Sequence, residues 1–133
     1  MNELYLDIHG VGVTLRGGPE DVLEDLRRDF EYFSMPFPAE AGAIELDLEP
    51  RSPEAAPEGK PVFRTKDYAV LAGPAGRIIV YADGARAEYD YAARRGRILC
   101  ADPERLHELA LLAVLSRAGE ALDLRGWHRI HAL

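Results

Sequence analysis

Residues 60–101 read KPVFRTKDYAVLAGPAGRIIVYADGARAEYDYAARRGRILCA, and this stretch decides the fold. It contains five short runs rich in β-branched, aromatic and alternating apolar residues, at 62–65, 68–72, 77–82, 85–91 and 97–100. Turn sequences separate these runs: Lys66-Asp67, GPAG at 73–76, Asp83-Gly84 and RRG at 94–96. Asp-Gly between two such runs is a strong hairpin signal. Strands at this regular spacing predict an antiparallel meander in one twisted sheet, and they argue against a β–α–β alternation.

The preceding residues predict a hairpin, a helix and a third strand. Apolar residues alternate at 4–8 and, after Gly10, at 11–15, which is typical of two paired strands. Pro19 followed by two acidic residues predicts a helix start, and an apolar stripe then continues to Phe33 before Pro36 stops it. The alternation IELDLE at 44–49 predicts a strand with an acidic outer face, and the proline-rich stretch 50–59 predicts an exposed loop.

The C-terminal part predicts a second helix. Asp102 before Pro103 and an acidic residue is a strong helix N-terminus, and Gly126 is a plausible stop. Residues 106–115 are apolar on nearly every side, so we expect cover on both faces of this helix. The sheet can cover one face, and the first helix or something outside this chain must cover the other. The predicted fold class is therefore α+β: an antiparallel meander sheet with two helices, the C-terminal one long and apolar.

Composition excludes several classes of partner and site. The chain has 133 residues and a formal net charge of −7; residues 1–60 hold 5 basic and 14 acidic side chains (−9), and residues 61–133 hold 11 and 9 (+2). An acidic front half repels phosphate backbones and anionic lipid, which argues against nucleic acid and membranes as partners. Cys100, the only cysteine, allows no intrachain disulfide or cysteine zinc cluster and is expected to be buried. The start is unlike a signal peptide, so we expect a cytoplasmic protein.

No set of residues predicts a complete catalytic site. The nearest approach to a phosphate-binding loop, GPAGR at 73–77, lacks the lysine and the spacing, and is predicted to be a hairpin turn. The acidic strand face at 45–49 could offer oxygens to a hard cation, but carboxylates along a strand diverge, which favours a solvated face. His128 and His131 would point to opposite faces of a strand, which favours a structural or linker role; the alternative is a site completed by absent residues.

Residues 122–133, LDLRGWHRIHAL, look like the opening of a further strand after the long helix. This run resembles the one that precedes the nucleotide-binding domain of HPr kinase-like proteins, the bacterial HPr serine kinase-related ATPases. Arg125-Gly126 and His131-Ala132 are the motif-like residues; over the rest of the chain the resemblance is a pattern of elements. It implies an N-terminal α+β domain at 1–126, with 127–133 starting a strand that leads into an absent nucleotide-binding domain.

The resemblance also implies a function. The intact protein would be an ATP-dependent phosphotransferase that uses magnesium, with its P-loop downstream of this sequence and His131 near the active site. This chain would then be a non-catalytic recognition or dimerisation domain, truncated before the P-loop, whose partner is another protein or its own C-terminal kinase domain. Apolar residues of the C-terminal helix and its end are the interface candidates: Leu111, Val114, Leu115, Ala118, Leu122 and Trp127. The alternatives are a stand-alone homodimeric interaction module with no enzymatic role and, third, a small enzyme with an unrecognised polar site.

Overall fold

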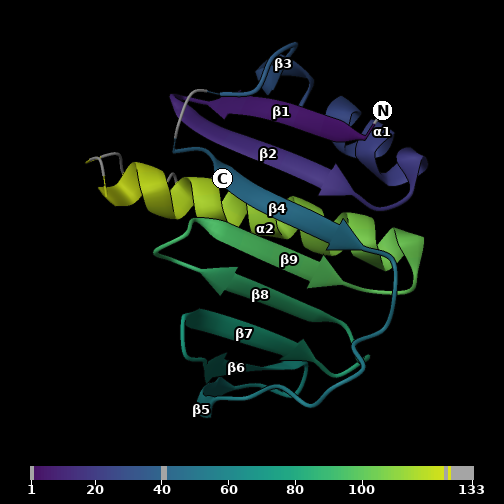
Figure 1. Ribbon diagram of the computed structural model, residues 1–133, viewed down its shortest axis with the longest axis vertical. Helices are drawn as coiled ribbons and strands as arrows, with labels where there is room; N and C mark the ends of the chain where they lie inside the picture. The colour runs from purple at the N-terminus through teal and green to yellow at the C-terminus, as the bar shows by residue number, and fades with distance from the viewer. Residues whose placement is uncertain (1, 40–41, 125, 127–133) are drawn as a thin grey trace.

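A computed structural model describes residues 2–39, 42–124 and 126 of the chain. They form a nine-stranded sheet in the order β3-β1-β2-β4-β9-β8-β7-β6-β5, with two α-helices on one of its faces (Figure 1). The predicted α+β class is therefore confirmed. The strand predicted from residue 127, which contains Trp127, His128 and His131, lies outside the described residues.

The N-terminal half begins with the predicted hairpin, β1 (Glu3–Ile8) and β2 (Val11–Gly17), which pair antiparallel. His9 and Gly10 form its turn with φ of 53° and 91°, a region that glycine adopts without steric cost. The predicted helix follows Pro19, but it ends at Asp29, before the expected stop at Pro36. The elements after the hairpin are α1 (Glu20–Asp29), a 3-10 turn (Glu31–Phe33), β3 (Ser34–Met35) and β4 (Ile44–Glu49).

The stretch 60–101 forms the meander that its turns predict. Each of its strands pairs antiparallel with the next. They are β5 (Lys60–Arg64), β6 (Tyr68–Ala72), β7 (Gly76–Tyr81), β8 (Arg86–Asp90) and β9 (Arg95–Leu99). The second helix, α2, spans Pro103–Leu124, and the Asp102 carboxylate caps it by accepting a hydrogen bond from the Arg105 amide at 3.3 Å. Among the described residues, no helix is both long and apolar enough to cross a membrane.

The sheet as a whole is mostly antiparallel but mixed, so the predicted antiparallel meander describes only part of it. β4 lies between β2 and β9 and runs parallel to both. The helix α1 connects β2 to β4, and this is the crossover that parallel neighbours require. After β4 the chain reverses its direction an even number of times before it reaches β9, so β9 runs in the same direction as β4. Residue periodicity identifies the strands, but it does not reveal which strands become neighbours.

The main core lies between the helices and one half of the sheet. Its largest side chains that are almost completely buried come from both layers: Leu6, Leu15, Leu23, Leu26, Ile98, Leu106 and Val114. Helix α2 contacts α1, β2, β4 and β9, and it buries one side against them. Its opposite side stays open, because Leu112 and Leu115 are 48% and 54% exposed. The described part of the chain therefore does not supply the expected cover on both faces of this helix.

Candidate recognition surface

On the helix side of the sheet, the strands beyond β9 carry apolar side chains that α2 covers only in part. Ile98 in β9 belongs to the core. A row of paired residues, one from each strand, leads from it toward the edge of the sheet: Ala87, Ile79, Val70 and Phe63. Paired residues of adjacent strands point to the same face, so this row lies on the same side as the helices. Tyr68 and Tyr81 form a second row beside it. We call Phe63, Tyr68, Val70, Ile79 and Tyr81 the aromatic floor.

The rings of the aromatic floor contact one another. The centroids of Phe63 and Tyr68 lie 6.1 Å apart, as do those of Tyr68 and Tyr81, both within the range of favourable aromatic pairs. The Arg105 guanidinium lies 5.0 Å from the centre of the Tyr81 ring, and burial raises the pKa of the Tyr81 hydroxyl. Phe63 is 55% exposed, so the outer end of the floor is open to solvent.

A cleft separates the aromatic floor from α2. A cavity of about 110 Å³ lies between them, and its lining includes Ile79 and Tyr81 from the sheet with Leu109, Leu112 and Ser116 from the helix. At the far end of the cleft, the Arg117 guanidinium lies 4.8 Å from the centre of the Tyr89 ring. The surface therefore has an apolar floor and one helical wall, with its other side open.

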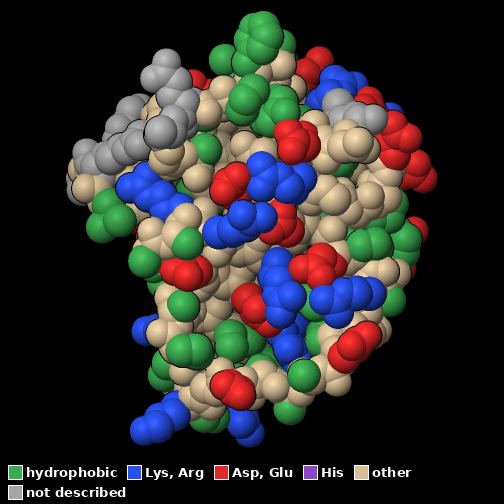
Figure 2. All heavy atoms as spheres, in the orientation of Figure 1, with side chains coloured by type: hydrophobic (Ala, Val, Ile, Leu, Met, Phe, Trp, Pro, Cys, Tyr) green, Lys and Arg blue, Asp and Glu red, His purple; other side chains and the backbone are tan. Residues whose placement is uncertain are grey.

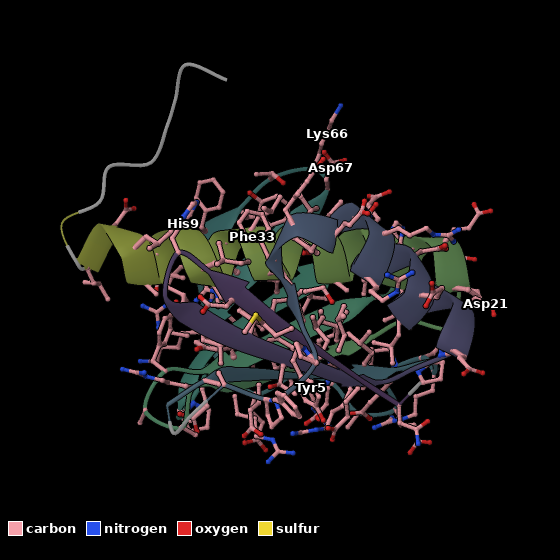
Figure 3. All side chains as sticks on the ribbon, turned by 90° about the horizontal axis from the view of Figure 1, so that it is seen from above. Tyr5, His9, Asp21, Phe33, Lys66 and Asp67 are labelled. Carbon is pink, nitrogen blue, oxygen red and sulfur yellow. The ribbon has the colours of Figure 1, made fainter. Side chains whose placement is uncertain are left out.

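Three cations that border this surface form no ion pair with any described residue. Lys60 and Arg77 both pair with Ala72, and Arg77 also pairs with Tyr89, so these residues point to the same side of the sheet. This is the helix side, because Tyr89 contacts Arg117 of α2. Figure 3 shows Lys66 on the same side, at the β5–β6 turn. Within the described part of the chain, none of these three cations forms an ion pair. Arg105, in contrast, is 2.7 Å from Asp83.

The opposite face of the sheet carries paired charges. Basic and acidic side chains alternate across the middle strands (Figure 2). Arg16 is 2.9 Å from Glu45, Arg95 is 3.0 Å from Asp47, and Arg97 is 3.6 Å from Glu49. Arginines of neighbouring strands therefore neutralise the acidic face of β4. The described residues contain no group of three or more side chains placed to hold a metal ion.

This paired-charge face is also hollowed. A depression of about 500 Å³ lies between the β6–β7 turn and the arginines of β9; Asp47, Glu88, Arg95 and Arg97 are among its lining residues. Arg97 donates to Glu88 at 2.9 Å and approaches Glu49, and these carboxylates raise its pKa further. Because Asp47 pairs with Arg95 and Glu88 pairs with Arg97, a ligand would have to displace an existing ion pair to reach any of these four side chains.

The predicted interface residues differ in their burial. Val114 and Ala118 are buried in the core of this chain, so they are not available as an exposed surface. Leu111 and Leu122 are half-buried and pack against that core, whereas Leu115 is exposed. Trp127 and His131 lie outside the described residues.

Sequence reasoning missed the aromatic floor. Phe63, Val70 and Ile79 read as ordinary strand residues with one buried face. The available signal was the number of strands, because two helices, each about 10 Å wide, cannot cover five meander strands together with the N-terminal strands. Comparisons of this chain with known protein families, with curated proteins and with solved structures found no match.

Proposed function

We propose that this chain is a non-catalytic recognition domain that works in the cytoplasm as the N-terminal domain of an HPr kinase-like, ATP-dependent phosphotransferase. The observation that carries the recognition role is the aromatic floor, in which Ile79, Val70 and Phe63 continue the core row outward and Phe63 is exposed to solvent. Exposed apolar surface bordered by charged residues marks sites where proteins bind other proteins. The family assignment rests on the resemblance of residues 122–133.

In this proposal the chemistry and the recognition are divided between domains. ATP and magnesium bind in the nucleotide-binding domain that the resemblance places after Leu133, with His131 close to that site. The present domain binds a protein partner or its own kinase domain through the aromatic floor and the adjacent wall of α2. Rigid aromatic side chains suit this role, because they bury a large area while losing little conformational entropy.

A homodimeric interaction module is the second candidate. Leu112 and Leu115 on the open side of α2 favour it, because two copies of the helix could cover them mutually. Analytical ultracentrifugation separates the two candidates. A monomer at micromolar concentration supports the recognition domain, and a tight dimer that Leu115→Ser dissociates supports the module.

The coding sequence and a binding measurement test the main proposal. We expect a Gly-x-x-x-x-Gly-Lys-Ser/Thr motif soon after Leu133, followed by a domain that binds this chain in calorimetry. Phe63→Ser should weaken that binding at least tenfold. Tyr32→Ser is the matched control, because Tyr32 is 94% exposed and precedes β3 at the opposite edge of the sheet. Binding of magnesium–ATP by residues 1–133 alone, or equal effects of the two substitutions, would refute the proposal.

A further inference from the structure

The outer edge of the sheet is poorly suited to receive another strand. In β5, Pro61 has no main-chain N–H to donate, and the register with β6 shifts between Pro61 and Phe63, which marks a bulge. Lys60 adds a charge at the start of the strand. Proline, bulges and lysine are the features by which proteins block pairing at an exposed sheet edge. A partner of the aromatic floor is therefore recognised through side chains on the face, and not by extending the sheet.

The aromatic floor has the width of one helix. The row from Phe63 through Val70 to Ile79 crosses two strand-to-strand spacings, which amounts to about 10 Å. An α-helix with its side chains is about 10–12 Å in diameter. Since α1 and α2 already cover β1, β2, β4 and β9, a third helix on the open side of α2 would continue the same helical layer over the outer strands of the meander. Leu112 faces that position from α2, because it lines the cleft together with Ile79.

The charges around the aromatic floor determine which charged residues the polar face of such a helix should carry. The chain as a whole carries −7, yet Lys60, Lys66 and Arg77 border this surface and form no ion pair in the described residues; the one acidic residue labelled beside them in Figure 3 is Asp67, next to Lys66. A helix that placed its apolar stripe on the aromatic floor would bring its flanking residues close to these three cations. Glutamate and aspartate at those flanking positions would be attracted, and lysine and arginine would be repelled.

We infer that the aromatic floor binds an amphipathic helix with an acidic polar face, which packs beside α2 and completes the helical layer. This inference rests on the proposed recognition function and adds the chemistry of the partner segment. The apolar stripe of that helix covers Phe63, Val70 and Ile79 and contacts Leu112. Its acidic residues pair with Lys66 and Arg77.

Three synthetic helical peptides of about four turns test this inference. The first carries leucine at positions i, i+3, i+4 and i+7 with glutamate elsewhere. The second replaces each glutamate with lysine, and the third replaces each leucine with glutamine. Binding is followed by amide shifts of the isotopically labelled chain. We expect the glutamate peptide to bind at least tenfold more tightly than either control at low salt, and to shift residues of β5–β7 and α2.

A charge-reversed variant sharpens the test. In Lys66→Glu/Arg77→Glu the preference should invert toward the lysine peptide, while the melting temperature stays close to that of the natural chain because both side chains are exposed. Equal binding of the two charged peptides, or shifts confined to the paired-charge face, would overturn the inference. So would a concentration-dependent dimer that Phe63→Ser abolishes, because a second copy would then occupy the floor.

The results also separate the inference from the proposed function. If the kinase domain binds in a manner sensitive to Phe63→Ser while the glutamate peptide does not bind, the helical partner is refuted and the recognition role stands. If neither binds, both are refuted.

Discussion

Two leucines one turn apart on α2 offer a direct test of how this helix is placed. Both side chains line the cleft, but Leu109 is 2% exposed and belongs to the core, whereas Leu112 is 48% exposed. Truncation of each to alanine removes the same atoms from the same helix, and alanine and leucine have similar helix propensities. Any difference in stability between the two variants therefore reports their tertiary environments.

The structure fixes the expected magnitudes. Leu109→Ala removes a fully enclosed side chain and leaves a cavity, which costs about 3 kcal/mol of unfolding free energy. Leu112→Ala removes a side chain that is already half in water, and solvent fills the space. It should cost about 1 kcal/mol, roughly half the value of burying a leucine completely. The two variants should thus differ by about 2 kcal/mol.

Urea unfolding followed by circular dichroism measures this difference. With a slope of about 2 kcal/mol per molar urea, the midpoint should fall by about 1.5 M for Leu109→Ala and by about 0.5 M for Leu112→Ala. The slopes themselves should stay equal. Equal losses for the two variants would show that Leu112 is buried in solution, and the open cleft on which the recognition surface depends would then not exist.

Three further outcomes are expected. In Gly76→Ala the new Cβ would lie 1.9 Å from the Tyr89 carbonyl oxygen, so β7 and β8 must separate, and thermal melting should show a loss of about 2 kcal/mol. A hydrogen bond from the Ala85 amide lowers the pKa of Asp83 below its usual 3.8. The ionised Asp83 carboxylate therefore stabilises the folded chain above pH 3.8, and this contribution is lost as the pH falls and the carboxylate is protonated. Asp83→Asn should make the fall in stability under acid titration less steep. Burial raises the pKa of the Cys100 thiol, so a disulfide reagent should modify it far more slowly in the folded chain than in urea.

Local patterns predicted the elements well where a single physical rule governs them. Alternation fixed the hairpin at β1 and β2, and Asp102 before Pro103 marked the start of α2, because an N-cap carboxylate satisfies amides that the helix leaves free. The glycine and aspartate turns between β5 and β9 likewise predicted the meander. Each of these features depends on residues within a few positions of one another.

The pairing of β4 and the division of α2 into buried and open sides required the tertiary structure. Alternation assigns residues to a face of a strand, but it does not choose the neighbouring strand, and β4 became the parallel centre of the sheet. The run of apolar residues at 109–115 likewise did not reveal that Val114 would be buried and Leu115 exposed. Burial depends on which elements lie across the helix, and contacts between residues far apart in the chain decide that arrangement. The aromatic floor exists for the same reason, because α1 and α2 together cover only part of a nine-stranded sheet.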